Sequence, residues 1–358
     1  MVLKYLRPFS ATMNLLRLAG ASPWLLGQGS LVVGTMVMAL SVYWDAWWHE
    51  RVGRESFWIP PHLGIYAGLI SSLGGFLLLR ELHRRRIPRG LWVYVAGVGA
   101  VVASGYADEL WHQRYGVEKI GTLEAIWSPT HVAALVGGSI AALGIISYLL
   151  QVIKTGSPRD ARLSWLVAAE FGVLVSIVTL LLLPLGPETP FRLLGIWGAP
   201  VVAFAILTVR FFGSAFSERR WALSVITTFN WAGNALLLSN HASSLLLGQL
   251  LAVGLVPPVL ADVIIHRKRT LKAVRKAHVM AGLVWGVIFG VFFYPLTNGL
   301  SFAQESLVLD YASLAVIGVT SAIASVLAGF LAGWKAEQWM RSRAVVMARA
   351  EIPAGARL

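Results

Sequence analysis

The amino-acid sequence predicts an all-α membrane protein with about ten transmembrane helices. Hydrophobic residues make up 57% of its 358 residues and charged residues only 13%, so a water-soluble domain of this composition would have too little polar surface to cover its core. Apolar runs of about 18 to 25 residues, the length that crosses roughly 30 Å of bilayer hydrocarbon as a helix, recur ten times. Arg clusters, prolines or glycines separate these runs, so each run is expected to be a separate helix.

The first four helices are expected to form two tandem hairpins. Each hairpin has a long apolar run, a polar loop and a second run that opens on a proline, Pro60 or Pro129. Proline suits the first turn of a helix because its missing N–H would have no partner there. An Arg-rich turn at 80–89 joins the two hairpins. The four expected helices are 28–48, 61–82, 91–112 and 129–153.

Six further apolar runs follow, and they contain no third copy of the polar loop. Two acidic residues, Glu170 and Asp262, lie at or near membrane depth in these runs, where a charged side chain is costly. Both are therefore functional candidates, with pairing to a neighbouring helix end as the alternative. The six expected helices are 162–184, 190–213, 220–240, 242–266, 277–297 and 311–334.

The basic residues predict the orientation of this bundle. When alternate loops are assigned to two faces, one face receives only five of the 30 Lys and Arg residues. The other face holds the rest, Arg210 included, and is cytoplasmic by the positive-inside rule. Both termini are then cytoplasmic, and the polar loops face outward from the plasma membrane. The five residues on the outer face are Arg51, Arg54, Arg114, Lys119 and Arg192.

The formal charge of +13 does not indicate a nucleic-acid partner. No stripe of Lys and Arg with interleaved aromatic residues lies on a soluble module, as nucleic-acid binding would require. Cytoplasmic basic residues instead favour contact with anionic lipid headgroups, so membrane lipid is the expected partner. The chain has no cysteine, which excludes disulfides and thiolate metal ligands.

These observations divide the chain into four regions. Residues 1–27 are expected to form a cytoplasmic amphipathic lead-in, and 28–153 a duplicated four-helix region that binds metal. Residues 154–335 form a six-helix membrane region, and 336–358 a cytoplasmic basic tail.

The most informative feature is a polar motif that occurs once in the loop of each predicted hairpin. Its pattern is Asp-x-x-Trp-His-x-Arg-x-Gly-x-Glu followed by Trp-x-Pro-x-His, and the second copy is longer by six residues between its Glu and its second Trp. Each copy supplies one carboxylate and two imidazoles, a set that binds copper, zinc or iron. The candidate metal ligands are Asp45, His49 and His62 in the first copy and Asp108, His112 and His131 in the second.

Helical spacing places the ligands of each copy together. Asp45 and His49 are four residues apart and project from one face of a helix, and the second copy repeats this spacing. The returning helix of the hairpin then brings its first-turn histidine alongside. One carboxylate and two imidazoles leave coordination positions open for water, oxygen or substrate, as a reactive metal requires. Other repeated residues suit the orientation of ligands, charge balance or exclusion of water: Trp48, Arg51, Arg54, Glu55, Trp111, Arg114 and Glu118.

Plainer interpretations stay open beside the metal site. The Trp residues, Trp58 and Trp127 among them, suit an aromatic belt at the membrane interface, and Asp and His could cap helix ends. The second copy could hold a second metal, join the first in a dinuclear site, or be a decayed duplicate. Further candidate ligands are Glu109, Glu124 and His241, whereas His83, His266 and His278 are expected to be solvated or to face lipid.

The motif resembles that of a known family, the C subunit of the copper-dependent membrane monooxygenases, which include particulate methane monooxygenase and ammonia monooxygenase. That subunit carries Asp-x3-His-x12-His in its membrane region, with Trp before the first His and Pro two residues before the second. The first copy repeats this spacing with Trp48 and Pro60 in place, whereas eighteen residues separate the histidines of the second copy. The resemblance implies copper at Asp45, His49 and His62, oxygen-dependent oxidation of a small apolar substrate, and partner subunits.

The sequence therefore predicts an integral membrane metal protein, with copper as the first choice of metal and zinc or iron as alternatives. Its leading function is that of a monooxygenase-like oxidoreductase subunit, acting on a small apolar molecule or a quinol. The alternatives are a copper acquisition or insertion factor and a non-catalytic subunit of a respiratory membrane complex, where the metal is structural. Other membrane subunits are expected partners.

Overall fold

The computed structural model describes nine stretches of the chain, and its regular structure over them is entirely helical. The described residues are 22–53, 58–84, 86–116, 127–155, 161–185, 193–240, 243–267, 271–293 and 311–351. Those of the first half form α2 (Pro23–Arg51), α3 (Pro60–Leu82), α4 (Arg89–Tyr115) and α6 (Pro129–Thr155). Those of the second half form α7 (Ala161–Leu182), α8 (Gly198–Ser217), α9 (Ala222–Leu238), α10 (Ser244–Arg267), α11 (Leu271–Ile288) and α13 (Tyr311–Glu351).

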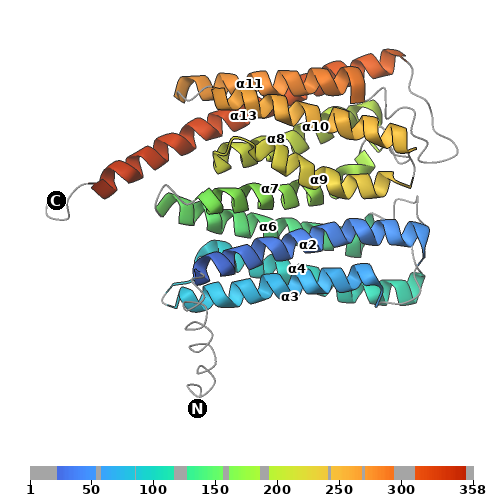
Figure 1. The fold of residues 1–358 in the computed structure, drawn as a ribbon. Coiled ribbons are helices and arrows are strands. Elements are labelled where there is room, and N and C mark those ends of the chain that lie inside the picture. The colour runs from blue at the N-terminus through green and yellow to red at the C-terminus, as the bar shows by residue number, and fades with distance from the viewer. Residues whose placement is uncertain are drawn as a thin grey trace.

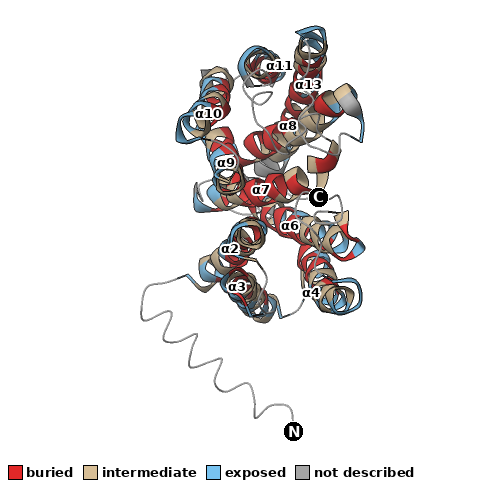
Figure 2. Cartoon of the chain, turned by 90° about the vertical axis from the view of Figure 1, so that its right-hand side faces the viewer, coloured by how far each residue is buried: buried red, intermediate tan, exposed pale blue. Residues whose placement is uncertain are grey.

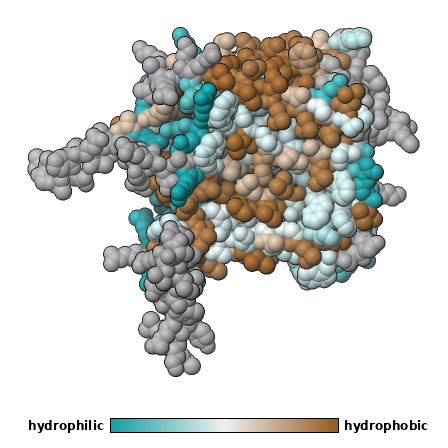
Figure 3. Space-filling model, in the orientation of Figure 1, coloured by the Kyte–Doolittle hydropathy of each residue, from teal (hydrophilic) through white to brown (hydrophobic). Residues whose placement is uncertain are grey.

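The predicted all-α membrane fold is confirmed by these ten α-helices of the described stretches. Nine of them are long and apolar enough to cross a membrane, and α9, with 17 residues, is shorter. The helices lie side by side along one direction (Figure 1). On the face shown in Figure 3, apolar residues cover the middle of the bundle and hydrophilic residues gather toward its ends. This distribution is the one that a bilayer requires.

Three helices differ clearly from their predicted bounds. α11 was predicted at 277–297 and instead covers Leu271–Ile288, followed by a π-helical turn at Phe289–Phe293. α8 begins at Gly198, not at residue 190, after a 3₁₀ turn at Gly195–Trp197. Pro200 explains the late start, because proline is tolerated in the first turn of a helix but not in its interior. α13 continues to Glu351, through the boundary that we placed at residue 335. Residues 334–351 contain neither glycine nor proline, so nothing ends the helix before Pro353.

The two hairpins form separate pairs on one side of α7. Figure 2, a view along the helices, shows α2 with α3 and α4 with α6 as neighbouring pairs, and α8 to α13 on the other side of α7. α2 begins and α13 ends at the same end of the bundle (Figure 1), as an even number of membrane passes requires. The assignment of this end to the cytoplasm stays a prediction.

The main hydrophobic core lies where α7 meets the two hairpins. Val167 of α7, Leu31 of α2 and Ile145 of α6 are completely buried in it. α2, α6, α8 and α9 all contact α7, so neighbouring helices cover it on several sides. The hairpins are therefore held by a central helix that itself carries none of their metal-ligand candidates.

Glycine pairs fix the register within both hairpins. A Cβ added to Gly34 of α2 would lie 2.6 Å from the Gly68 carbonyl oxygen of α3. A Cβ added to Gly97 of α4 would likewise lie 2.6 Å from the Gly137 carbonyl oxygen of α6. Helices approach this closely only where small residues face each other. Any larger side chain at these positions would force the two helices of a hairpin apart.

The glycine pairs stand at the same place relative to the polar motif in both hairpins. In each, the glycine of the outgoing helix precedes the Asp by eleven residues, and the second His precedes the glycine of the returning helix by six. The duplication therefore extends from the loop motif into the membrane-spanning helices. The glycine contacts fix the position of one helix along the axis of the other, and this position determines which ligands of the two helices lie opposite each other.

Arg210 corrects one predicted position. The residue lies inside α8, not in a cytoplasmic loop, and is only 5% exposed. Its Nη2 donates to Asn230 Oδ1 of α9 at 2.5 Å, and its guanidinium lies over the Trp285 ring of α11. The predicted helix ended at residue 213, whereas α8 continues to Ser217 and buries Arg210 among three helices.

Candidate metal centres

Centre 1 consists of Asp45 and His49, near the end of α2, and His62, in the first turn of α3. The Asp45 Oδ1 atom lies 3.4 Å from His49 Nε2 and 3.1 Å from His62 Nε2. The centroids of the two imidazole rings are 6.2 Å apart. The spacing of four residues along α2 and the return of the chain at Pro60 therefore bring these three side chains together.

Centre 2 consists of Asp108 and His112 of α4 and His131 of α6. Asp108 Oδ2 lies 3.0 Å from His112 Nε2, and Asp108 Oδ1 lies 3.3 Å from His131 Nε2. The two imidazole centroids are again 6.2 Å apart. Each ligand set thus closes within its own hairpin, so the two motif copies form two separate groups of three.

The distances within each group suit one metal ion bound by the three residues of that group. In each group one ligand atom from each residue lies within 4.8 Å of the other two. Ligand atoms at about 2.1 Å from one ion are roughly 3.0 Å apart at right angles and roughly 3.4 Å apart at the tetrahedral angle. The four carboxylate-to-imidazole distances, from 3.0 to 3.4 Å, span this range.

The carboxylate of centre 1 has an oxygen without a hydrogen-bond partner. Asp45 Oδ1 is buried, and within the described residues no donor meets hydrogen-bond geometry at this atom, although two Nε2 atoms approach it. A buried carboxylate oxygen left this way is costly unless a cation satisfies it. A metal ion between Asp45, His49 and His62 would remove this cost.

The protonation of His112 gives a second argument at centre 2. Its Nδ1 lies 3.2 Å from the Gly116 carbonyl oxygen, which can only accept, so Nδ1 carries the proton. In the neutral imidazole, Nε2 then presents a lone pair to the Asp108 carboxylate. Two lone pairs at 3.0 Å repel each other unless Nε2 is protonated as well or a metal ion lies between the two atoms. A backbone carbonyl on one nitrogen and a metal on the other is a common arrangement for histidine ligands.

Both hairpins leave their first helix by a glycine in the left-handed backbone region. Gly53 follows α2 with φ of 91°, and Gly116 follows α4 with φ of 82°. Residues with a side chain rarely adopt such angles, so the glycine of the motif ends the helix. The helix end places the Asp and the first His at the loop end of the hairpin, opposite the first turn of the returning helix.

The neighbours of the carboxylate differ between the two centres. In centre 2 the Thr130 hydroxyl donates to Asp108 Oδ1 at 2.6 Å. Pro61 occupies the corresponding position of centre 1 and has no hydroxyl. Both imidazoles of centre 1 approach the same oxygen, whereas those of centre 2 approach different oxygens. Centre 2 therefore has a carboxylate held by its surroundings.

The residues predicted to surround the ligands differ in burial and in the residues that they contact. Trp48 is half-buried and packs edge-on against Trp44, and Trp111 packs against Tyr115. Arg51 is exposed, and its Nε donates to Asn240 Oδ1 of the α9 end at 2.5 Å, so it binds a neighbouring helix. Arg114 is exposed as well. Arg54, Glu55, Glu118, Glu124 and His241 lie outside the described residues.

Polar contacts that connect the hairpins to their surroundings were not predicted from the sequence. Asn240 also donates to Glu50 Oε2 at 2.6 Å, and thereby joins the end of α2 to α9. Thr130 stands at an unspecified position of the motif, between Pro129 and His131, and no role was predicted for it. Trp127 was assigned to a belt or wall, and its indole N–H in fact donates to the Leu181 carbonyl oxygen at 2.9 Å. Glu109 belongs to neither group of three and accepts from Gln113 at 3.1 Å.

Two histidines expected to be solvated or to face lipid are packed against protein. His278 of α11 is only 1% exposed, with Nδ1 at 2.9 Å from the Val274 carbonyl oxygen. α13 covers it, because a Cβ on Gly329 would lie 2.3 Å from the His278 carbonyl oxygen. His83 is half-buried and lies edge-on against Trp24.

Asp262 binds the end of a neighbouring helix, which was the structural alternative to a functional role. Its carboxylate accepts from the backbone N–H groups of Leu223 and Ser224 at 3.2 and 2.8 Å. These groups belong to the first turn of α9, where N–H groups have no partner within the helix. Asp262 therefore stabilises a helix end, as acidic residues do at that position.

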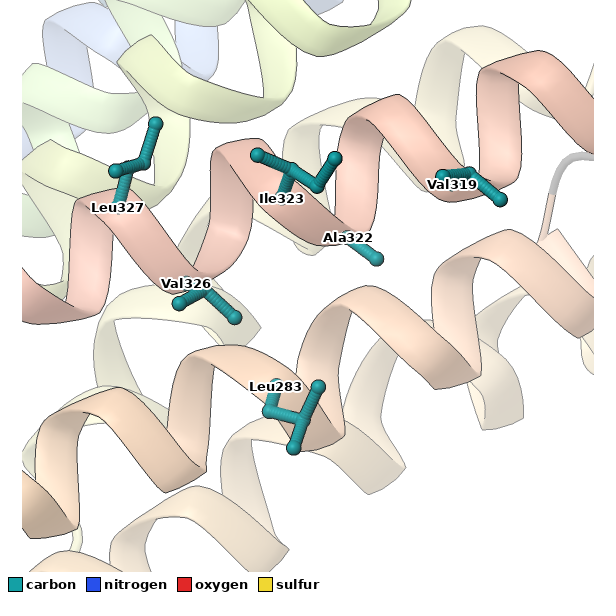
Figure 4. Close-up of a pocket in the computed structure, with 6 residues that line it drawn as sticks. All are labelled: Leu283, Val319, Ala322, Ile323, Val326 and Leu327. Carbon is teal, nitrogen blue, oxygen red and sulfur yellow. The ribbon is translucent and has the colours of Figure 1, made fainter.

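A groove in the second half of the molecule is apolar, unlike the two metal-ligand groups. It lies between α11 and α13 (Figure 4) and is lined by apolar side chains: Leu283, Val319, Ala322, Ile323, Val326 and Leu327. Such a lining supplies neither metal ligands nor acid–base groups. Among the described residues, the groups able to hold a metal ion lie in the two hairpins.

The chain matches no protein-family model, no curated protein and no solved structure. The fold and the two centres therefore define it only as a polytopic membrane protein with two Asp/His/His groups able to hold metal ions.

Proposed function

We propose that this protein is a copper-binding membrane oxidoreductase subunit that resembles the copper-dependent membrane monooxygenases. One observation carries the proposal: in both hairpins, one carboxylate and two imidazole Nε2 atoms converge at distances of 3.0 to 3.4 Å. At centre 1 the shared oxygen, Asp45 Oδ1, has no hydrogen-bond partner among the described residues. A metal ion held by these three donors would satisfy that oxygen.

Ligand chemistry supports copper as the first choice. Imidazole nitrogen suits copper, zinc and iron, and among divalent ions copper binds such sites most strongly. Three protein ligands leave positions open for an exchangeable ligand, which a closed structural site does not. Copper would supply one-electron chemistry with oxygen at such a position, and the spacing shared with the monooxygenase subunit supports this choice over zinc.

The chain's own residues hold the ion and restrict access to it. Asp45 neutralises part of the charge, and His49 and His62 bind through Nε2. Trp48 with Trp44, and Trp111 with Tyr115, place aromatic surface near the centres, which favours a small apolar molecule or a quinol as substrate. We place the centres at the outer face of the plasma membrane, with both termini in the cytoplasm and other membrane subunits as partners.

One observation favours a second candidate function, the acquisition or insertion of copper. The Nδ1 atom of His49 is buried and has no hydrogen-bond partner in the described part of the chain. A histidine whose second nitrogen is not held reorients more easily than one that is. Centre 1 would then release its ion to an acceptor protein, and centre 2 would retain its own.

Spectroscopy on copper-loaded protein tests the proposal. The purified full chain is loaded with Cu(II), dialysed, and examined by electron paramagnetic resonance for nitrogen coupling from two imidazoles. We expect the signal to disappear with a quinol and to return with oxygen. The matched control is the double variant Asp45→Ala/Asp108→Ala, which keeps all histidines.

Two outcomes count against the proposal. An identical signal in the double variant means that copper binds elsewhere, and the metal assignment fails. A signal that quinol does not reduce excludes the oxidoreductase and favours the insertion function.

A further inference from the structure

Glu170 is a carboxyl group buried in the middle of the membrane-spanning bundle. It is completely buried and lies in α7, nine residues after the first residue of that helix. At 1.5 Å per residue, this is about 14 Å along the helix, near the centre of a hydrocarbon layer roughly 30 Å thick. It belongs to neither metal centre.

The surroundings of Glu170 offer no compensating charge. Within the described residues, no Lys, Arg or His forms an ion pair with it, and its only hydrogen-bond partner is Thr35 of α2. From α4, the uncharged Tyr94 hydroxyl is within electrostatic range. The nearby helix α8 carries a buried arginine, Arg210, but this cation is engaged with Asn230 and the Trp285 ring. The second carboxyl oxygen, Oε1, is buried and has no hydrogen-bond partner in the part of the chain that the structure describes.

The hydrogen bonds of Thr35 indicate where the proton lies. Its Oγ1 is 2.8 Å from Glu170 Oε2, 2.9 Å from the Val32 carbonyl oxygen and 3.2 Å from the Leu31 carbonyl oxygen. The hydroxyl has a single proton, which a backbone carbonyl of α2 can accept. The contact with Glu170 then needs a proton from the carboxyl group. A neutral carboxyl also avoids the cost of an unpaired buried charge.

Further buried polar groups lie between Glu170 and the predicted cytoplasmic end of the bundle. Gln28 stands on the same face of α2 as Thr35, two turns earlier, and its Nε2 donates to the Tyr148 hydroxyl at 3.4 Å. The Tyr148 hydroxyl is also 3.4 Å from His83 Nε2 at the end of α3. Burial lowers the pKa of His83, so its neutral imidazole can accept this hydroxyl proton.

We propose that Glu170 is an intramembrane proton-binding site, neutral in the resting protein, which exchanges its proton with the cytoplasmic end through the side of the bundle that holds Tyr148 and His83. The proton leaves the carboxyl as H⁺ and returns to the carboxylate, and no redox step is involved. Exchangeable acids at membrane depth are parts of proton relays in membrane proteins. The inference does not depend on the metal proposal.

Infrared spectroscopy of the full chain in lipid nanodiscs tests the site. We expect the wild type to show the carbonyl band of a protonated carboxylic acid, and this band to be absent in Glu170→Gln. The band should survive in Asp262→Asn, which changes the other buried carboxyl. Thr35→Val, which removes only the hydroxyl, should shift the band and not abolish it, so the test stands even if Glu170→Gln folds poorly.

Exchange into D₂O then tests the route. The band of the folded wild type should shift to that of the deuterated acid, and Tyr148→Phe should slow this shift about tenfold, the effect of losing one hydrogen bond. Tyr106→Phe, the same change at an exposed residue, should have no effect. Absence of a Glu170 band, or a band that never exchanges, overturns the proton-binding site, and an unchanged rate in Tyr148→Phe overturns the route. Metal content, measured on the same samples, should stay at the wild-type value, which separates this result from the fate of the metal proposal.

Discussion

Centre 1 and centre 2 have the same frame and different surroundings. Both combine an Asp and a His four residues apart with a His from the first turn of a returning helix. Their imidazole pairs have the same centroid separation of 6.2 Å and interplanar angles of 59° and 54°. The frame is the same because glycine contacts fix the register of both hairpins.

The two centres differ in how firmly their ligands are held. At centre 2, the Gly116 carbonyl oxygen holds the His112 ring and the Thr130 hydroxyl holds the Asp108 carboxylate. At centre 1, His49 Nδ1 and Asp45 Oδ1 have no hydrogen-bond partner within the described residues. Exposure does not separate the two centres. His131 is more exposed than His62, at 34% against 12%, but His112 is less exposed than His49, at 8% against 19%. The hydrogen bonds therefore indicate an exchangeable centre 1 and a preorganised centre 2.

The largest effect is expected where the shared frame is broken. Gly34→Ala and Gly97→Ala each place a methyl group within 2.6 Å of backbone atoms of the facing helix. Overpacking of this kind costs about 2 kcal/mol, and we expect each variant to lower the unfolding temperature in detergent and to weaken metal binding in its own hairpin. Gly29→Ala and Gly99→Ala are matched controls, since their added Cβ atoms meet nothing within 4 Å. Equal effects in variants and controls would show that the glycines do not set the register.

The next effect concerns the carboxylate of centre 2. Thr130→Val keeps the shape of the side chain and removes the hydroxyl that orients Asp108. Loss of such an outer partner typically weakens metal binding by 10 to 100 times, so we expect a loss of about tenfold at centre 2. Thr130→Ser should bind like the wild type. The measurement is a metal titration in an Asp45→Ala background, where only centre 2 remains. Tighter binding by Thr130→Val would mean that the hydroxyl competes with the metal.

A smaller effect is expected in the release of bound metal. The single variant Asp108→Ala retains centre 1, and Asp45→Ala retains centre 2. No described residue hydrogen-bonds to His49 Nδ1, whereas the Gly116 carbonyl oxygen lies 3.2 Å from His112 Nδ1. We therefore expect a chelator to remove metal from centre 1 several-fold faster, by up to about tenfold. Stopped-flow absorbance with a coloured chelator measures both rates. If centre 1 released its ion more slowly than centre 2, centre 2 would be the exchangeable centre and centre 1 the one that retains its ion.

The smallest effect is expected at the link between α2 and α9. Asn240→Ala removes hydrogen bonds to Glu50 and Arg51, near the surface. Contacts of this kind contribute about 0.5 to 1 kcal/mol, so we expect a slight loss of thermal stability and unchanged metal content. Gln113→Ala, which removes only a contact within α4, is the control. Loss of metal in Asn240→Ala would show that α9 positions centre 1.

The helices and the ligand sets could be predicted from the sequence because both follow simple periods. Apolar length identifies a membrane helix, and four-residue spacing places Asp45 beside His49. The start of α8 was also readable from Pro200, and the length of α13 from the absence of glycine and proline before Pro353.

Other features depend on contacts between distant segments and gave no local signal. The burial of Arg210 follows from its placement among α8, α9 and α11. The role of Thr130 depends on the axial position of α6 relative to α4, which places its hydroxyl next to Asp108. The glycine pairs were visible in the sequence, but their spacing has meaning only when the two helices of a hairpin are aligned, as Gly34 and Gly68 show.

The metal content of four proteins tests the central claim most directly: the wild type, Asp45→Ala, Asp108→Ala and the double variant. Each is loaded with copper, dialysed and measured by elemental analysis against protein concentration. Two separate three-ligand centres predict about two ions per chain in the wild type, about one in each single variant and none in the double variant. The account is contradicted if the wild type holds no more metal than the double variant, and the claim of separate centres fails if either single change removes both ions.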